Sequence, residues 1–204
     1  MRLDFLFDFG SPNAYLCYRA LPAIEREHSV RFKYVPILLG GVFKATGNRS
    51  PGELYAGVIN KNRYDEMEME LFCEEYSFSG YRHNPDFPIN TLPLMRGAIA
   101  ARRMGIYEKY VDEVFRCMWS DVRNMGDPEI FKRSLDEAGI DSGRLTALIQ
   151  ELDVKQELIM STERAVEQGV FGAPTFFVGE RMYFGKDRLH KVVADIKSHA
   201  MAKA

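Results

Sequence analysis

The chain has 204 residues, of which 46% are hydrophobic and 27% are charged, so it can bury a substantial core in one large domain or two small ones. Its net charge of −2 gives no basic surface of the kind that binds nucleic acid. No apolar stretch approaches the roughly 20 residues that span a bilayer and no secretory signal pattern opens the chain, which predicts a cytoplasmic protein with no membrane partner.

The first residues predict a buried strand that turns directly into a helix. Arg2 to Phe9 is crowded with apolar and aromatic side chains, as in a central parallel strand that is buried on both faces. Ser11 is a favoured N-cap residue and Pro12 a favoured first helical residue, so the helix start is signalled twice. The N–H groups and dipole of this helix favour an anion beside Ser11, although capping alone also explains the Ser-Pro pair.

The pattern then becomes helical and stays so over the middle of the chain. Leu16 to Glu27 predicts a helix in which Pro22 starts a second segment or causes a kink, and Val30 to Ile37 predicts a second strand. Short breaks rich in Gly, Pro and Asn separate further predicted helices over 63–76, 92–104, 107–119, 128–138 and 142–151. We therefore predict an all-helical domain over residues 39–153, inserted into an α/β domain formed by residues 1–38 and 154–204.

An α/β pattern returns near the end of the chain. A helix is predicted over 154–168, a strand over 175–178, a hairpin partner over 181–184 and an amphipathic helix over 186–200. The resulting order is β-α-β, an all-helical insertion, and then α-β-β-α. This order predicts a thioredoxin-like fold that is interrupted in its middle.

A proline stands at the turn before the strand at 175–178. The sequence Gly172-Ala173-Pro174-Thr175 predicts a tight turn in which Ala173–Pro174 is a candidate cis bond. Ala173 would then present its backbone N–H and C=O at a strand end, where an extended peptide can pair with them in β fashion.

The cysteines argue against thiol chemistry by the chain itself. Cys17, Cys73 and Cys117 are odd in number, far apart and form no CxxC pair, which predicts neither a disulfide framework nor a zinc site. Cys17 follows Ser11 by nearly two helical turns, too far to act as a resolving thiol. The histidines show no ligand spacing either, so we expect neither a dithiol oxidoreductase nor a metal enzyme.

Five short sequence motifs occur along the chain, at residues 7–16, 36–48, 87–91, 170–176 and 184–189. In this order they resemble the 2-hydroxychromene-2-carboxylate isomerases and the related kappa-class glutathione transferases, over about residues 3–197. The resemblance implies a DsbA-like thioredoxin fold with an inserted helical domain. It also implies a glutathione-dependent site between the two domains.

The resemblance implies roles for three residues of the thioredoxin-like part. Ser11 would hold the glutathione sulfur, and Ala173, before a cis Pro174, would pair with the cysteinyl backbone. Asp187 would meet the γ-glutamyl amine, or else cap the last helix.

Two further glutathione residues are implied within the helical insertion. Asn48 would contact the tripeptide, or else cap a turn. Lys61, before Tyr64, would meet the glycyl carboxylate, a role for which Arg63 competes because the preceding loop differs from that of the family. Both cations are alternatively solvated surface residues.

The substrate side is less defined. Phe43 and Phe87 are candidates for an apolar wall, and Lys44 or Arg49 for holding a substrate carboxylate. Asn13 and Lys186 depart from the residue types usual in the family, so the fit to substrate differs accordingly.

The activity that the resemblance implies is a cis-trans isomerisation of an aromatic 2-oxo acid, by reversible addition of a glutathione thiolate. Glutathione is then a cofactor, and the protein is a homodimer, as family members commonly are. Two alternatives stay open: a kappa-like transferase or peroxidase that consumes glutathione, and a non-catalytic thioredoxin-like module that binds peptides.

Overall fold

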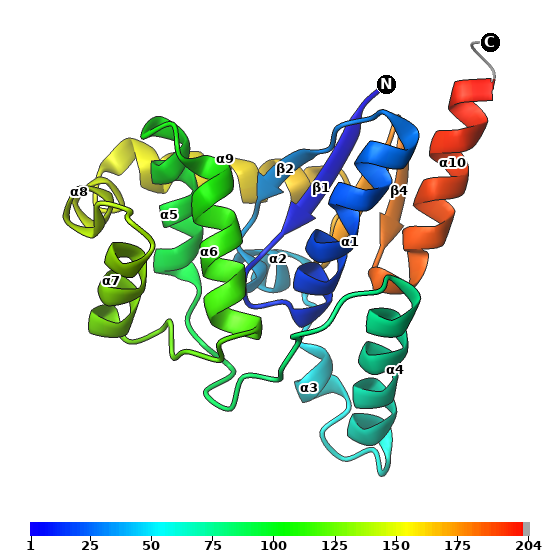
Figure 1. Cartoon of the computed structure of the whole chain (residues 1–204), viewed down its shortest axis with the longest axis horizontal. Coiled ribbons are helices and arrows are strands. Elements are labelled where there is room, and N and C mark those ends of the chain that lie inside the picture. Colours follow the sequence, from blue (N-terminus) through cyan, green and yellow to red (C-terminus); the bar gives the residue numbers. More distant parts are fainter. Residues whose placement is uncertain (202–204) are drawn as a thin grey trace.

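The computed structural model describes residues 1–201 and is built on a four-stranded sheet. The strands are β1 (Leu3–Phe7), β2 (Lys33–Pro36), β3 (Thr175–Val178) and β4 (Arg181–Phe184), in the spatial order β2-β1-β3-β4. β1 is parallel to β2 and antiparallel to β3, and β3 and β4 form an antiparallel hairpin. The two ends of the chain therefore meet at β1 and β3, in the middle of the sheet (Figure 1).

Helices cover the sheet (Figure 1), and along the chain the segment between β2 and β3 is mostly helical. The helices are α1 (Pro12–His28), α2 (Leu39–Thr46), α3 (Pro51–Leu54), α4 (Lys61–Glu75), α5 (Leu92–Arg103), α6 (Tyr107–Trp119), α7 (Pro128–Glu137), α8 (Ser142–Leu148), α9 (Leu152–Glu167), the 3-10 helix η1 (Lys186–Arg188) and α10 (Leu189–Met201). Their order confirms the predicted thioredoxin-like fold with helices inserted in its middle. Within the described residues, every helix is too short or too polar to cross a bilayer.

The sheet is packed on both faces, as the apolar run of β1 predicts. Phe5 and Phe7 belong to a large buried cluster that includes residues of α1, α10 and the inserted helices. Leu6, which points to the other face, belongs to a smaller cluster with Val42 of α2 and Ala165 of α9. The large cluster runs through both parts of the chain, so the division into residues 1–38 with 154–204 and 39–153 stays a prediction.

Some element boundaries differ from the prediction. α1 continues through Pro22 as one helix, whereas a kink or a new segment was expected there. The second strand is shorter than predicted because it pairs with β1 only over Lys33–Pro36. The segment 39–54 forms the short helices α2 and α3, which the sequence did not single out, and the last helix begins with the 3-10 turn η1.

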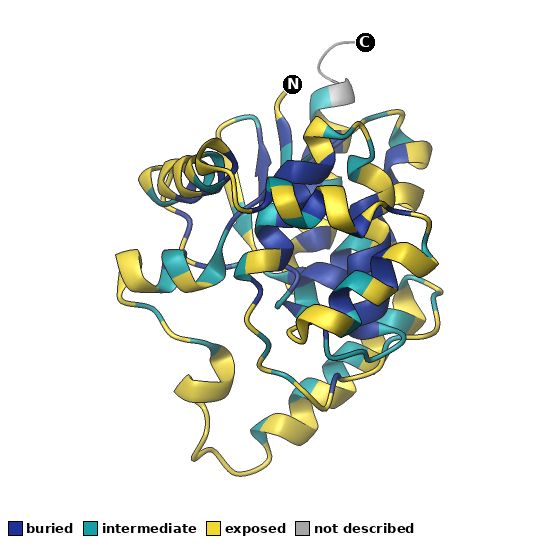
Figure 2. Ribbon diagram, turned by 90° about the vertical axis from the view of Figure 1, so that its left-hand side faces the viewer, coloured by how far each residue is buried: buried dark blue, intermediate teal, exposed yellow. Residues whose placement is uncertain are grey.

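One part of the molecule extends away from this core. α3, the loop after it and the first turns of α4 lie lowest in Figure 1, and they are mostly exposed in Figure 2. Every residue from 51 to 60 is exposed. We call residues 50–71 the α3–α4 arm.

Candidate active site

Ser11 lies at the corner where β1 leads into α1, and the local sequence explains its place. Its side chain accepts a hydrogen bond from the Ala14 N–H at 3.1 Å, so it caps α1, and Pro12 is the first helical residue, both as predicted. Only 6% of Ser11 is exposed. The dipole of a long helix thus points its positive end at a nearly buried hydroxyl.

The Ser11 hydroxyl faces the turn that precedes β3. Ser11 Oγ donates to the Ala173 carbonyl at 3.1 Å, and the Ala173–Pro174 bond is cis, as predicted. Within the described residues the Ala173 N–H donates to no partner, which leaves a free backbone donor beside the hydroxyl. Tertiary structure therefore joins two motifs that lie 162 residues apart in sequence.

A buried aspartate fixes this corner. One carboxylate oxygen of Asp8 accepts from the Gly10 N–H and the other from the Leu39 N–H at the start of α2, each at 2.8 Å. Burial raises the pKa of the Asp8 carboxyl, and these N–H bonds oppose the rise. A side chain at Gly10 would meet Thr91 Cγ2 at 3.0 Å, so the turn is also tightly packed.

The motif after β4 lies beside the cis proline. Gly185 donates its N–H to the Pro174 carbonyl at 2.9 Å, and this bond places η1 next to the Ala173 turn. The Asp187 carboxylate is exposed, and within the described residues it accepts only from Lys186 Nζ, at 2.5 Å. It accepts from no backbone N–H of the described residues, so capping does not explain its presence.

Lys186 is the buried member of this pair. Only 7% of its side chain is exposed, and Nζ also lies 3.6 Å from a carboxylate oxygen of Glu68 on α4. These ionic contacts join η1 to α4 and therefore connect the cis-proline region to the α3–α4 arm.

Asn48 connects the end of α2 to the same region. Its Nδ2 donates to the Phe171 carbonyl at 2.8 Å, and its Oδ1 accepts from the Arg49 N–H at 2.8 Å. Asn48 therefore does more than cap a turn, since it holds the segment that leads to Ala173.

Lys61 stands apart from the residues around Ser11. It begins α4, forms an ion pair with Asp65, and its Nζ lies 5.0 Å from the centre of the Tyr55 ring. Glu68 lies seven positions further along the helix, which corresponds to a rise of about 10 Å. Arg63 is exposed on the same helix.

The candidate substrate residues do not all lie in the same part of the structure. Phe43 is half-buried, and Arg49 is exposed after α2. Lys44 lines a groove between α2, α5 and α9 that Ser11 does not line. Phe87 packs on Trp119 with ring centres 5.5 Å apart, in the aromatic core of the helical part, and the Phe87–Pro88 bond is cis, which the sequence did not predict.

No thiol of the described chain lies at the corner. Cys17 is fully buried on α1, and burial raises its pKa above that of a free thiol. Burial also raises the pKa of Cys117 to about 12. No group of three or more His, Cys, Asp or Glu residues within the described residues is placed to hold a metal ion.

Two side chains near the corner were not predicted as site residues. The role of Asp8 was not predicted, although an acid directly after a buried strand is an unusual placement. The Oδ1 atom of Asn13, two residues after Ser11, is buried and has no hydrogen-bond partner among the described residues. Its only signal was its departure from the family's usual residue.

Comparisons with known proteins agree with the thioredoxin-like fold described above. A family model described as DSBA-like thioredoxin domain matches residues 2–197. A 2-hydroxychromene-2-carboxylate isomerase from Pseudomonas sp. (strain C18) is 28% identical over 92% of this chain and 86% of the relative. The Homo sapiens protein named glutathione S-transferase kappa 1 is 24% identical over 92% of this chain and 87% of the relative. A solved structure of a 2-hydroxychromene-2-carboxylate isomerase superposes with a TM-score of 0.86 at 23% identity, over 100% of this chain and 98% of that one.

Proposed function

This chain belongs to the family of DsbA-like thioredoxin domains, and from that premise we propose that it is a glutathione-dependent isomerase of an aromatic 2-oxo acid of the 2-hydroxychromene-2-carboxylate type. Relatives named as such isomerases and as kappa-class transferases support the coarser statement that it is an isomerase or transferase. Glutathione dependence and the mechanism are our inference.

The observation that carries the proposal is the 3.1 Å contact between Ser11 Oγ and the Ala173 carbonyl. It brings a hydroxyl, the positive end of α1 and a backbone edge for an extended peptide to one point. Because Cys17 is buried further along α1, the sulfur for which this corner is suited must come from a ligand.

The backbone of Ala173 supports binding of a cysteine-containing peptide. Its N–H has no partner among the described residues and is free to pair with a peptide carbonyl. Its C=O holds the Ser11 hydroxyl, which donates to one acceptor at a time. When a peptide N–H takes this carbonyl, we expect the hydroxyl to turn toward the peptide's sulfur.

The hydroxyl and the end of α1 would then stabilise a thiolate. A free thiol has a pKa of about 8.5, and lowering it by about two units requires roughly 2.7 kcal/mol. The chemistry that bound glutathione supplies is reversible addition to a conjugated double bond, which makes that bond single and free to rotate. Ser11 thus acts by holding the sulfur in its reactive state.

The remaining cofactor residues follow from their surroundings. We assign the γ-glutamyl ammonium to Asp187, whose carboxylate is exposed. Lys61 takes the glycyl carboxylate by exchanging its present partner Asp65. Asn48 holds the segment before Ala173 and reaches the tripeptide by opening one of its two bonds.

For the aromatic substrate, we assign the apolar wall to Phe43. Lys44 and Arg49 are the candidates for its carboxylate. Phe87 is better explained as part of the core, because it packs on Trp119.

We also propose that the protein is a cytoplasmic homodimer that pairs through the α3–α4 arm. Of the fourteen large apolar residues that are exposed in the described part of the chain, seven fall on the arm: Leu54, Tyr55, Val58, Ile59, Tyr64, Met67 and Leu71. Such a concentration of exposed apolar surface is typical of an interaction site. The cytoplasmic placement is supported by the three free cysteines.

The experiment that tests the function is a substrate comparison. The full chain is assayed with 2-hydroxychromene-2-carboxylate and with a chlorinated nitrobenzene, each with and without glutathione. Isomerisation that requires glutathione without consuming it supports the proposal, whereas conjugation to the nitrobenzene alone supports the transferase alternative. Calorimetry that detects no glutathione binding would instead leave a non-catalytic peptide-binding module.

A further inference from the structure

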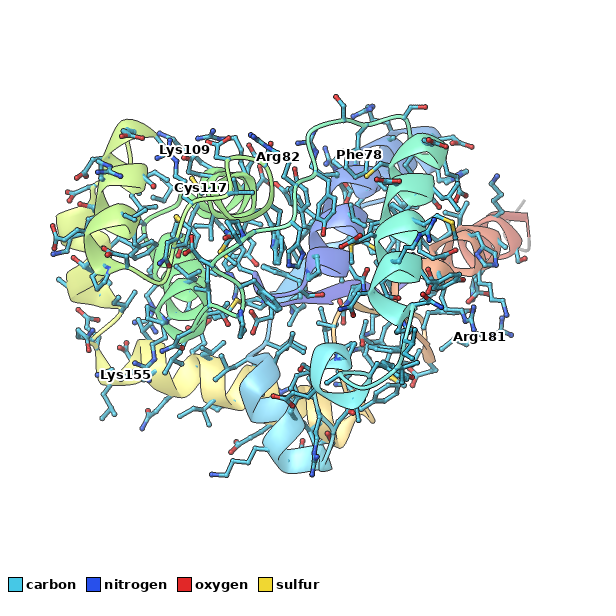
Figure 3. All side chains as sticks on the ribbon, turned by 90° about the horizontal axis from the view of Figure 1, so that it is seen from below. Phe78, Arg82, Lys109, Cys117, Lys155 and Arg181 are labelled. Carbon is cyan, nitrogen blue, oxygen red and sulfur yellow. The ribbon has the colours of Figure 1, made fainter. Side chains whose placement is uncertain are left out.

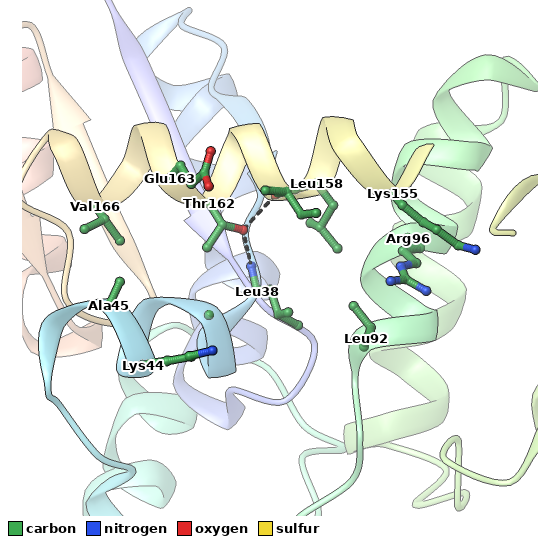
Figure 4. Close-up of a pocket in the computed structure, with 12 residues that line it drawn as sticks. Leu38, Lys44, Ala45, Leu92, Arg96, Lys155, Leu158, Thr162, Glu163 and Val166 are labelled. Carbon is green, nitrogen blue, oxygen red and sulfur yellow. Dashed lines mark hydrogen bonds between the residues drawn. The ribbon is translucent and has the colours of Figure 1, made fainter. Parts of the chain in front are cut away.

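A groove of about 340 Å³ lies between α2, α5 and α9 (Figure 4). Ser11 and Ala173 do not line it. Successive residues are about 100° apart around a helix, so Gly41, which lines the groove, and Phe43 lie on opposite sides of α2. Apart from Lys44, which lines the groove and is also a candidate for holding that substrate's carboxylate, the groove is distinct from the surface that we assign to the isomerised substrate.

The floor of the groove is apolar. Leu38, Leu92 and Leu158 contribute to it, and the hydroxyl of Thr162 is already used. This hydroxyl accepts from the Leu38 N–H at 3.0 Å and donates to the Leu158 carbonyl at 2.8 Å. The floor thus offers apolar contact and no free hydroxyl to a ligand.

The rim of the groove is cationic. Lys44, Arg96 and Lys155 line it together with one acid, Glu163. Within the described part of the chain, none of the four lies within 4 Å of an oppositely charged group. Arg96 and Lys155 are drawn at the α5 end of the groove (Figure 4), and Lys155 lies at the outer edge of the molecule (Figure 3).

Arg96 carries the second, independent observation. Its guanidinium makes no hydrogen bond to any residue that the structure describes, and of its nitrogens only Nε is buried. A buried donor without an acceptor costs free energy, and a carboxylate is the acceptor that matches the planar guanidinium. The site therefore combines an apolar floor with a guanidinium that has no partner among the described residues.

We propose that this groove binds a hydrophobic carboxylate with one or two aromatic rings. The rings lie on the apolar floor, and the carboxylate accepts hydrogen bonds from Arg96 and Lys155. The volume is at the lower end of the range of small-molecule sites, about 300–1,000 Å³, which favours a compact acid over a long acyl chain. The inference does not require that the chain bind glutathione.

The test measures binding of 2-naphthoate to the full chain by calorimetry, without glutathione. We expect it to bind at least tenfold more tightly than the neutral 2-naphthamide, and more tightly than dodecanoate. Arg96→Met and Lys155→Met should each weaken binding about tenfold. The control Lys191→Met, an exposed cation on α10, should change it less than twofold.

The variants keep the test decisive. Lys155 is at the surface, so its variant reports on the groove even if Arg96→Met fails to fold. Ser11→Ala should retain naphthoate binding, and S-methylglutathione should not displace the probe, which separates this inference from the proposed function.

Three results would overturn the inference. They are equal binding of acid and amide, tighter binding of dodecanoate, and displacement by S-methylglutathione. Sedimentation is measured in the same samples. If the groove bound a second copy of the chain, adding naphthoate would dissociate that dimer.

Discussion

The Ser11 corner and the α3–α4 arm differ in what holds their residues. At the corner, Ser11, Asp8 and Ala173 are held by hydrogen bonds between four elements of the same chain. On the arm, Ile59 is 87% exposed, and the charged and aromatic groups that Lys61 meets within the described residues all lie on the arm itself. The corner is thus held by hydrogen bonds between distant parts of the chain, whereas much of the arm is exposed.

Removing the corner hydroxyl should have the largest effect. Ser11→Ala should lower glutathione-dependent isomerisation by about 10²–10³-fold, the range found when one donor to a reacting anion is lost. The lost N-cap should lower the free energy of unfolding by only about 1 kcal/mol. Steady-state assay and urea unfolding measure the two effects.

The matched control for this variant is Asp141→Ala. It also removes an N-cap side chain, in this case from α8, and should leave activity unchanged. If Ser11→Ala and Asp141→Ala have the same activity, the hydroxyl has no role beyond capping.

The next effect concerns the arm. Ile59→Asp places a charge on its most exposed apolar residue and should weaken a homodimer about tenfold to a hundredfold, as measured by sedimentation at several concentrations. Leu152→Asp, which is also exposed but lies on α9, should leave the dimer intact. A wild-type chain that stays monomeric at high concentration would contradict the assignment of the arm.

Lys61 is the proposed cofactor residue that lies on the arm, and it should show a smaller effect. Lys61→Ala should raise the dissociation constant for S-methylglutathione about tenfold, the loss of one charge-assisted hydrogen bond. Arg63→Ala, two residues further along α4, serves as the control and should change it less than twofold. The opposite ranking would transfer the carboxylate role to Arg63.

The smallest effect should appear in the pH dependence of stability. Because burial raises the pKa of Asp8 in the folded state, the folded chain holds this proton more tightly than the unfolded chain. The stabilising contribution of Asp8 is therefore full at pH values below its unfolded pKa of about 3.8, and it declines as the pH rises through the raised, folded pKa. Asp8→Asn should abolish this component.

The measurement is the free energy of unfolding of both proteins between acid and neutral pH. The gap between wild type and Asp8→Asn should be widest in acid. Curves that stay parallel throughout would show that Asp8 does not titrate differently on folding. Asp141→Asn, at an exposed N-cap, is the control.

Local signals predicted most of the elements of the fold. The helix over 107–119 and the strands over 175–178 and 181–184 were predicted with the bounds that the structure has. The segment 39–54 was not resolved into helices, because Gly40 and Gly41 weaken helix propensity over α2, and α3 has only four residues. α1 continues through Pro22 because packing of its apolar face outweighs the lost hydrogen bond.

The candidate site was predicted in part. The motifs and the resemblance singled out Ser11, Ala173 and Asn48, and the structure brings the Ser11 hydroxyl to Ala173 and Asn48 to the segment before it. Local sequence did not predict that Lys44 lines a separate groove or that Asp8 accepts from the Leu39 N–H of α2. Both depend on which faces of α2 meet α9 and the corner.

The sequence by itself determined the strand-to-helix corner at Ser11, the turn at Pro174 and the order of elements, because capping, proline geometry and apolar periodicity act over a few neighbouring residues. Only the tertiary structure decided that Asp8 reaches Leu39, that Lys186 reaches Glu68 and that the arm is left uncovered. Those contacts join residues far apart in the chain, and burial and hydrogen bonding select them only when the whole core packs.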